Sequence, residues 1–296
     1  MTLKYFIVDV FAEEKYQGNQ LAVFMDTAKL TTEEMQSIAL ETNFAETTFI
    51  ESSEKVKGGY NVRIFTPDTE VPFAGHPTLG TAFILSNYIE PKNNHLLMNY
   101  KVGQIPVTIA EDNTLFMTQV QPEFLGTISK TETSGILGIE NHDIMDFPIQ
   151  QVSTGLPFYI VPLKSLASLR KVAVNTPKYR ALMNRSTEQE ITPAFLSFCK
   201  EPYGEDHDLC CRMHYMENNQ IVEDSATGSA NGCLLSYLLK YSILESKQLE
   251  LKVEQGYEIN RPSLIYHKGE LSEENYSIKI GGKVQLISEG SWYHED

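Results

Sequence analysis

TGSANGCLLSYLLKY, residues 227–241, begins with small residues and continues as an apolar, helix-forming segment. GHPTLGTAFILSNYI, at 75–89, has the same plan: small residues at a turn, a glycine a few residues on, and then an apolar helix predicted over 78–89. The two glycines are Gly80 and Gly232. Both helices are apolar enough to be buried, and strand-like segments surround each of them. The repetition predicts two similar halves, each a sheet wrapped around one central helix.

The strand-like segments that surround these helices are short and numerous. A helix is predicted over 30–42, opened by a capping box of Thr31 and Glu34, and a polar helical region over about 165–200. Many strands with few crossover helices indicate an α+β protein with mostly antiparallel or mixed sheets. The strands are predicted at 4–12, 19–26, 45–52, 60–67, 96–101, 105–112, 115–121, 147–153, 158–163, 210–216, 249–255, 263–268 and 277–288.

Composition limits the partners. The chain has 296 residues, 42% hydrophobic and 21% charged, as in soluble globular proteins. Its net charge of −15 and lack of a basic run argue against nucleic acid and against an anionic membrane, because both require clustered Lys and Arg. No apolar run reaches the roughly 18 residues of a membrane span, and the first residues read as a strand. Four cysteines without zinc-site spacing favour free thiols, no metal and a cytoplasmic location.

Glu46 and His76 are candidates for acid–base chemistry. Glu46 lies in NFAETTF, and a carboxylate buried among apolar residues has a raised pKa that suits proton transfer. A solvated carboxylate at a strand start is the commoner role of such a residue. His76 is flanked by Gly75 and Pro77 at a helix entrance, where a histidine held by a backbone partner is an equal alternative.

Asp224 and the TGS stretch form the second candidate region. Asp224 fits a helix cap, but Ser225 or Thr227 fits that position equally well, which leaves Asp224 to face a ligand. The TGS stretch lacks the lysine of a phosphate-binding loop, so a carboxylate bound by backbone N–H groups is the better ligand. GxSxG and HExxH motifs are missing from the sequence. The residues alone support an acid–base enzyme without a cofactor, acting on a small anionic molecule.

Several blocks, in this order, resemble the PhzF family of phenazine-biosynthesis-like isomerases. That family is similar in fold to diaminopimelate epimerase, with two pseudo-symmetric halves and an active site in the cleft between them. The resemblance implies a first half over 1–120, with Glu46 and His76, and a second half over 121–296, with Asp224; the last strand belongs to the second half or returns to the first. The blocks are DVFAEEKYQGNQLAVF (9–24), ETNFAETTFI (41–50), VRIFTPDTEVPFAGHPTLGTA (62–82), IVEDSATGSANG (221–232) and QGYEINRPS (255–263).

The resemblance also implies a mechanism. In the phenazine enzyme the substrate is dihydro-hydroxyanthranilate, and a glutamate moves a proton between ring carbons without metal or organic cofactor. That glutamate corresponds to Glu46 here, and the supporting His and Asp correspond to His76 and Asp224. The backbone around Gly75 and Gly228–Ser229 matches the part that holds the substrate carboxylate. Family members commonly form homodimers, so a homodimer is expected.

Departures from the family keep the substrate and two other functions open. Ala45 replaces the serine before the catalytic glutamate, Gln20 stands where GNP is usual, and Ser225 varies the EDP/EDA position. One alternative is a two-base racemase or epimerase, which needs a thiol in each half-site loop; FAGHPT and DSATGSA contain none. The other is a non-catalytic protein that binds a small amino or hydroxy acid.

Overall fold

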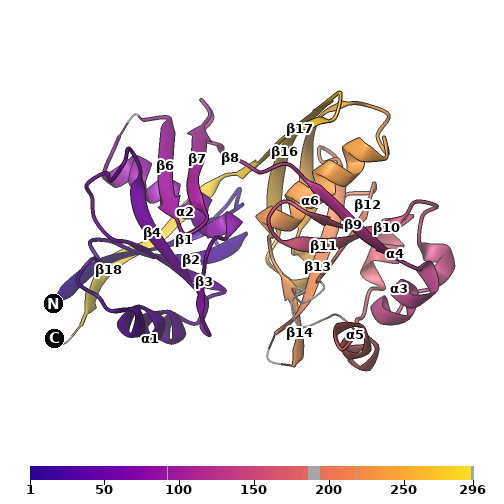
Figure 1. The fold of residues 1–296 in the computed structure, drawn as a ribbon, viewed down its shortest axis with the longest axis horizontal. Coiled ribbons are helices and arrows are strands. Elements are labelled where there is room, and N and C mark those ends of the chain that lie inside the picture. The colour runs from indigo at the N-terminus through magenta and orange to yellow at the C-terminus, as the bar shows by residue number, and fades with distance from the viewer. Residues whose placement is uncertain (92, 186–193, 218, 295–296) are drawn as a thin grey trace. The chain divides into compact units, whose positions relative to one another are not determined.

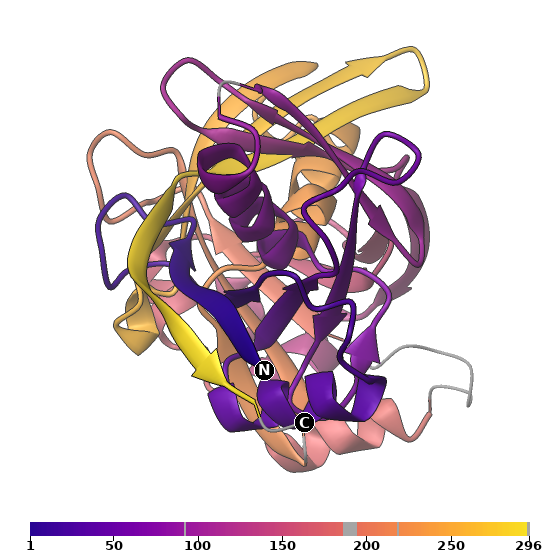
Figure 2. The same ribbon diagram turned by 90° about the vertical axis from the view of Figure 1, so that its left-hand side faces the viewer.

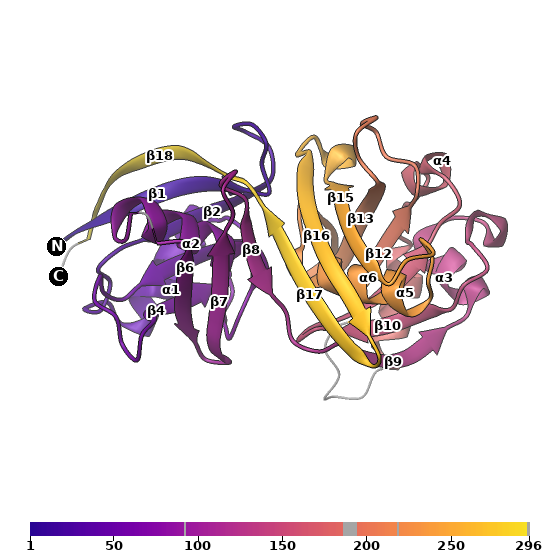
Figure 3. The same ribbon diagram turned by 90° about the horizontal axis from the view of Figure 1, so that it is seen from above.

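The computed structural model describes residues 1–91, 93–185, 194–217 and 219–294. They fold into two compact units (Figure 1). Unit 1 consists of the described residues within 1–118 and 281–294, and unit 2 consists of the described residues within 119–280. Strand β18, near the C-terminus, therefore belongs to unit 1, where Figure 3 shows it running along β1.

Unit 1 is a mixed sheet around one helix. From β18 the strands follow the order β18, β1, β2, β3, β4, β6, β7 and β8, with parallel pairs β2–β3 and β4–β6 and antiparallel pairs elsewhere. The elements are β1 (Thr2–Val10), β2 (Asn19–Phe24), α1 (Thr32–Thr42), β3 (Glu46–Ile50), β4 (Tyr60–Phe65), β5 (Glu70–Val71), α2 (Gly75–Tyr88), β6 (His95–Tyr100), β7 (Gly103–Ile109), β8 (Leu115–Thr118) and β18 (Val284–Tyr293).

Helix α2 fills the concave side of this sheet. It contacts β1, β2, β3, β6 and β8, and Figure 2 shows it with the strands of unit 1 around it. The helix is buried without interruption from Gly75 to Ala82. Gly80 makes the close approach possible, since a Cβ there would lie 2.5 Å from a methyl group of Leu21 in β2. An apolar helix without a polar face can be stable only in such an enclosed position.

Unit 2 repeats the plan. From β9 the strands follow the order β9, β10, β11, β12, β13, β15 and β16, with parallel pairs β11–β12 and β13–β15. The elements are β9 (Glu123–Ile128), α3 (Lys130–Leu137), η1 (Asn141–Asp143), β10 (Ile149–Ser153), β11 (Pro157–Pro162), α4 (Leu166–Arg170), α5 (Thr176–Met183), β12 (Ala194–Cys199), β13 (Leu209–Glu217), β14 (Gln220–Asp224), α6 (Gly228–Lys240), β15 (Gln248–Gln255), η2 (Tyr257–Ile259) and β16 (Ser263–Ser272), and β17 (Asn275–Gly282) leads out of the unit.

The two units share one topology. Read from β18 and from β9, the first six strand pairs are antiparallel, antiparallel, parallel, antiparallel, parallel and antiparallel in both. In each unit a hairpin, β4–β5 or β13–β14, precedes the central helix. Helix α6 packs against β10, β11 and β16, as α2 packs inside the first sheet. The α+β class and the paired helices predicted from the sequence are confirmed.

Several predicted boundaries differ from the structure. Helix α2 begins at Gly75 rather than at 78, so the glycine and histidine of FAGHP form its first turn. The helical region predicted over 165–200 holds α4 and α5 but ends in strand β12, whose side chains are all buried; residues 186–193 lie outside the described residues. The strand predicted over 277–288 is two strands, β17 and β18. The capping box of Thr31 and Glu34 is present as predicted.

Candidate functional site

In unit 1 the structure brings Glu46 and His76 together. Glu46 is the first residue of β3 and its side chain is 19% exposed; His76 is the second residue of α2 and its side chain is 6% exposed. The Nε2 atom of His76 lies 3.5 Å from the Oε2 atom of Glu46. A half-buried carboxylate therefore faces a buried imidazole at the start of the central helix.

His76 is neutral in this environment. Burial lowers the pKa of its imidazole to about 3, and a hydrogen bond to the backbone of Gln20 offsets only part of that effect. Within the described residues Nε2 has no hydrogen-bond partner of good geometry, so the ring nitrogen that donates to the Gln20 carbonyl is Nδ1. The lone pair of Nε2 then points toward the Glu46 carboxyl group, where it can accept a proton or a hydrogen bond.

Threonines on β3 and α2 fix the distance between Glu46 and His76. Thr81 of α2 donates to the hydroxyl of Thr48 at 3.0 Å, and both side chains are fully buried. Thr47, next to Glu46, shares a 2.8 Å hydrogen bond with Thr42 at the end of α1. The strand that carries Glu46 is therefore tied to the helix that carries His76 and to the helix that precedes it.

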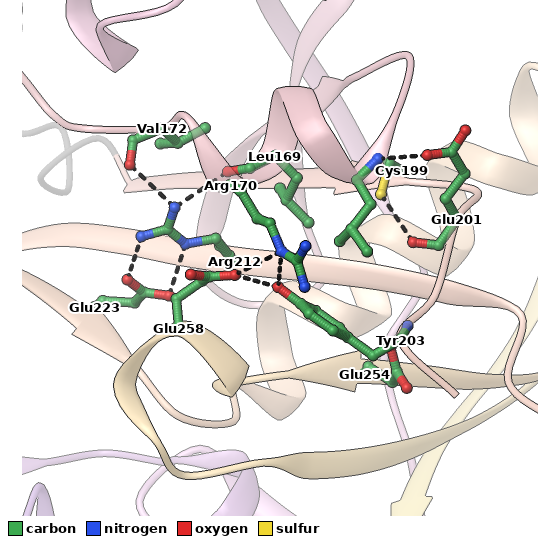
Figure 4. A network of polar contacts seen from close by, with 11 residues as sticks. Leu169, Arg170, Val172, Cys199, Glu201, Tyr203, Arg212, Glu223, Glu254 and Glu258 are labelled. Carbon is green, nitrogen blue, oxygen red and sulfur yellow. Dashed lines mark hydrogen bonds and ion pairs between the residues drawn. The ribbon is translucent and has the colours of Figure 1, made fainter. Parts of the chain in front are cut away.

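In unit 2, the two acidic residues of the VEDSATGS stretch have different roles. Glu223 and Asp224 are neighbours on β14, so their side chains point to opposite faces of the sheet. Arg212 of β13 binds Glu223 through two hydrogen bonds of 2.9 and 2.6 Å (Figure 4), and its remaining nitrogen donates to backbone carbonyls at Leu169 and Val172. Glu223 is therefore held in an ion pair with Arg212, and its side chain is 10% exposed.

The pKa of Glu223 agrees with that role. Burial would raise it, but the hydrogen bonds from Arg212 and His214 outweigh burial and bring the pKa to about 2. The carboxylate is ionised and bound on one face of β14, while Asp224 lies on the other face.

Asp224 is held by the loop that follows it. The hydroxyl of Thr227 donates to Oδ2 of Asp224 at 2.5 Å. The sequence left Ser225 or Thr227 as the alternative helix cap, and this expectation is wrong for the side chains: Thr227 occupies the N-cap position, but in the described structure its side chain makes no capping hydrogen bond. The threonine hydroxyl is directed at Asp224 instead.

Both central helices therefore begin without a side-chain cap. Ala74 precedes α2 and Thr227 precedes α6, and among the described residues neither supplies a capping hydrogen bond from its side chain. Neither first turn contains an acidic residue. Backbone N–H groups at such an end keep their donors for another acceptor, and the helix dipole favours a negative one.

Two side chains that directly follow strands β8 and β10 fix the first turn of α6. Gln119 donates to the carbonyl of Gly228 at 2.9 Å, and Thr154 donates to the Gln119 side-chain oxygen at 2.5 Å. A Cβ at Gly232 would overlap the Gln119 amide. Gly232 is therefore the position at which only glycine lets this amide reach Gly228.

None of the four cysteines has the character of a catalytic base. All four are buried, and burial raises the pKa of Cys199 to about 11 and that of Cys233 to about 12. Cys210 and Cys211 are shifted in the same direction. A thiol with so high a pKa carries almost no thiolate near neutral pH.

The structure thus places the sequence-predicted residues in two groups. Glu46, His76 and Gly75 lie together in unit 1, and Asp224 and Gly228–Ser229 lie in one loop and helix turn of unit 2. In the residues that the structure describes, no three His, Cys, Asp or Glu side chains are placed to hold a metal ion, and no helix is long and apolar enough to cross a membrane.

Sequence reasoning missed Arg212, Thr227 and Gln119 as supporting residues. Arg212 reaches Glu223 because β13 and β14 pair in a register that places Met213 opposite Asp224. The sequence does not reveal this register. Gln119 is far from α6 in the chain. Thr227 was considered only as a cap; its spacing of three residues from Asp224 was the available signal.

Comparisons with known proteins identify the family of the chain. The family model for phenazine biosynthesis-like proteins (PhzC-PhzF) matches residues 8–290. The trans-2,3-dihydro-3-hydroxyanthranilate isomerase of Pseudomonas aeruginosa is 32% identical over 295 residues, covering 98% of this chain and 99% of the relative. The solved structure of a PhzF family protein from Bacillus anthracis matches with a TM-score of 0.88 at 28% identity, covering 99% of this chain and 100% of that one.

A more distant structure bears on the fold alone. A hydroxyproline epimerase from Agrobacterium vitis matches with a TM-score of 0.60 at 9% identity, covering 98% of this chain and 92% of the epimerase. This likeness and the repeated topology confirm the predicted diaminopimelate epimerase-like fold. The chain therefore belongs to the phenazine biosynthesis-like (PhzF) family and is an isomerase.

Proposed function

We propose that this isomerase moves a proton between two carbons of a small substrate that bears a carboxylate, an amino or a hydroxy acid, and that Glu46 is the acid–base group. The observation that carries the proposal is the pairing of Glu46 with His76: a half-buried carboxyl group lies 3.5 Å from a neutral imidazole at the start of a buried helix. A carboxyl group held in such a position can exchange a proton with a carbon atom that lies within its reach, which is what a general acid–base group requires.

The chemistry needs no electron acceptor. The carboxylate of Glu46 takes a proton from one carbon, the electron pair of that C–H bond moves into the neighbouring unsaturated system, and the same carboxylic acid returns a proton to another carbon. The net change is the position of one hydrogen and of the double bonds. His76, neutral and hydrogen-bonded to Gln20, offers a lone pair that can accept a hydrogen bond from the Glu46 carboxylic acid after it has taken the proton.

The substrate carboxylate is proposed to bind at helix N-termini. Gly75 and His76 begin α2, Gly228 and Ser229 begin α6, and neither helix start has a side-chain cap within the described structure. Backbone N–H groups and the positive end of a helix dipole favour an anion, and they also stabilise negative charge that develops next to it. In this proposal Asp224 accepts hydrogen bonds from the amine or hydroxyl group of the substrate and sets its orientation.

Two other functions compete with this one. A two-thiol racemase is disfavoured by the burial and raised pKa of all four cysteines, so epimerisation would require a different second base. A non-catalytic binder of a small acid is distinguished by proton exchange. A binder does not transfer deuterium from D₂O into carbon positions of its ligand, whereas an isomerase that acts through a proton does.

The test is a screen in D₂O. Trans-2,3-dihydro-3-hydroxyanthranilate, for which the Pseudomonas aeruginosa relative is named, is the first compound, followed by small cyclic and acyclic amino acids. Carbon-bound deuterium measured by NMR or mass spectrometry, unchanged after dialysis against a chelator, supports the cofactor-free isomerase. Binding of one of these acids without any deuterium incorporation supports the binder. The homodimer and the cytoplasmic location stay predictions; light scattering tests the first.

A further inference from the structure

The QGYEINRPS stretch, at 255–263, lies at the end of β15 and the start of β16 and has no part in the chemistry proposed above. Gln255, its first residue, is fully buried. Its side chain reaches under the loop that joins Asp224 to α6 and makes hydrogen bonds with both ends of its amide. A buried amide that is hydrogen-bonded at both ends, here to the loop, to α6 and to Cys211 of β13, holds the loop in a single conformation.

The oxygen end of Gln255 receives hydrogen bonds from the helix start. Its Oε1 atom accepts from the backbone N–H of Thr227 at 3.3 Å and from the side chain of Asn231 at 2.9 Å. Asn231 is oriented in turn by His267, whose Nε2 atom lies 2.9 Å from the Asn231 oxygen. These contacts decide which end of the Gln255 amide faces the loop: the NH₂ group points toward Asp224.

The nitrogen end of Gln255 then orders a relay. Its Nε2 atom donates to the backbone carbonyl of Asp224 at 3.0 Å and to the hydroxyl oxygen of Thr227 at 3.0 Å. Because that hydroxyl oxygen accepts a bond from Gln255, its own proton is directed to the Oδ2 atom of Asp224. Gln255 therefore recruits the Thr227 side chain for Asp224 and keeps it away from the N-terminal N–H groups of α6.

The residues after Gln255 complete the support of this loop. Gly256 has a φ of +80°, and a Cβ there would lie 2.6 Å from the carbonyl oxygen of Ser225. Ser263 donates to the same carbonyl at 2.8 Å. The stretch that the function had left unexplained thus contacts the candidate loop at consecutive backbone positions.

We propose that Gln255 is a positioning residue of the active site: through Thr227 it sets the orientation of the Asp224 carboxylate, and it keeps the first turn of α6 open for the substrate carboxylate. The inference rests on the proposed function in one respect, namely that Asp224 and α6 contact the substrate. Gln255 itself is fully buried, and its hydrogen bonds go to the loop, to the helix and, at 3.6 Å, to the thiol of Cys211 in β13.

Two substitutions test the contributions of the oxygen and nitrogen ends of the Gln255 amide separately. Gln255→Glu keeps oxygen acceptors for Thr227 N–H and Asn231 but removes both donated bonds, so the Thr227 hydroxyl turns from Asp224 to the new carboxylate. Gln255→Met removes both sets of bonds with little change of volume. Glu254→Gln is the matched control: this neighbouring side chain is also fully buried but points to the opposite face, where it accepts from Tyr203 N–H, Gly204 N–H and His207.

The kinetic arm uses trans-2,3-dihydro-3-hydroxyanthranilate as the probe. Because a misplaced Asp224 weakens substrate binding, Gln255→Glu is expected to raise KM by about tenfold or more, the loss typical of one charged hydrogen bond. Thr227→Val, which removes the last bond of the relay, is expected to raise KM similarly. The control Glu254→Gln lowers the melting temperature and leaves KM unchanged. A purely structural role of Gln255 would reduce the amount of folded enzyme, and hence the apparent kcat, at constant KM; that result overturns the proposal.

The second arm does not depend on activity. Amide hydrogen exchange of residues 224–229 is compared with that of the later turns of α6. Gln255→Met is expected to speed exchange at Thr227 about tenfold or more while residues 234–239 stay protected, and Gln255→Glu is expected to keep Thr227 protected. If the wild-type protein incorporates no carbon-bound deuterium into any of the acids tested, the proposed function fails. The amide-exchange experiment alone then decides whether Gln255 positions the loop. Unchanged protection at Thr227 in folded Gln255→Met contradicts the positioning role.

Discussion

Mild acid is expected to destabilise the protein because two histidines are buried in the neutral form. Burial lowers the pKa of His76 and of His267 to about 3 each, while an unfolded histidine titrates near 6.5. Between these values the unfolded chain binds more protons than the folded one, so stability is lost as the pH falls below about 6.5. At pH 5 the solution is about 1.5 units below the pKa of an unfolded histidine. Each buried histidine then lowers the free energy of unfolding by roughly 2 kcal/mol relative to pH 7.

The window from pH 7 to 5 isolates this effect. Carboxylates whose folded pKa is lowered, such as Glu70 and Glu223 at about 2, lose their contribution only below the unfolded value near 4.5. The total expected loss of about 4 kcal/mol is a large part of the 5–15 kcal/mol typical of a protein. Urea unfolding at several pH values, followed by far-UV circular dichroism and by the fluorescence of Trp292 in β18, measures it.

Substitution assigns the slope to its residues. His76→Gln and His267→Gln should each remove about half of the pH dependence between pH 7 and 5, whatever they do to stability at pH 7. His142→Gln, at an exposed histidine, is the control and should leave the slope unchanged. If His76→Gln and His267→Gln both keep the wild-type slope, the neutral buried histidines do not cause the acid sensitivity and the reasoning is refuted.

Three further substitutions test the supporting contacts. Arg212→Met leaves the carboxylate of Glu223 without its partner and should lower the free energy of unfolding, measured in urea, by about 3–5 kcal/mol. Adding Glu223→Gln to the same chain should restore most of this loss. If the losses of the two substitutions add instead, the pairing is contradicted. Gly232→Ala displaces the Gln119 amide and should lower the free energy of unfolding by about 1–3 kcal/mol, measured as a lower melting temperature. An unchanged melting temperature would show that the amide has room to move. Gly228→Val should weaken binding of a carboxylate ligand about tenfold or more while the protein stays folded, whereas normal affinity in the folded variant would remove this helix turn from the site.

Most of the fold was predictable because its strongest signals are local. The apolar stretches after Gly75 and Gly228 have too little polar surface to form exposed helices, so both had to be central. The capping box of Thr31 and Glu34 predicted the start of α1, because this motif depends only on two residues three positions apart. Strand β12, AFLSFC, was missed because a short, continuously buried apolar run has no alternation to distinguish it from a helix, and polar residues precede it.

The site was predictable in its residues and not in its contacts. Family motifs pointed to Glu46, His76 and Asp224, but the separate roles of Glu223 and Asp224 follow from β14 pairing with β13, which is a long-range property. Gln255 illustrates the same limit. Its four hydrogen bonds to Asp224, Thr227 and Asn231 exist only because β15 ends beneath the loop, and nothing in the local sequence indicates them.

The central claim is that Glu46 transfers the proton, and a direct measurement tests it. Glu46→Gln keeps the shape of the side chain and removes the base, so it should bind ligand with nearly normal affinity. The rate of carbon-bound deuterium incorporation from D₂O, measured with saturating substrate, should fall by about 10²–10⁴-fold relative to the wild type, the range typical of a general acid–base group. A folded Glu46→Gln protein that incorporates deuterium at the wild-type rate would contradict the account.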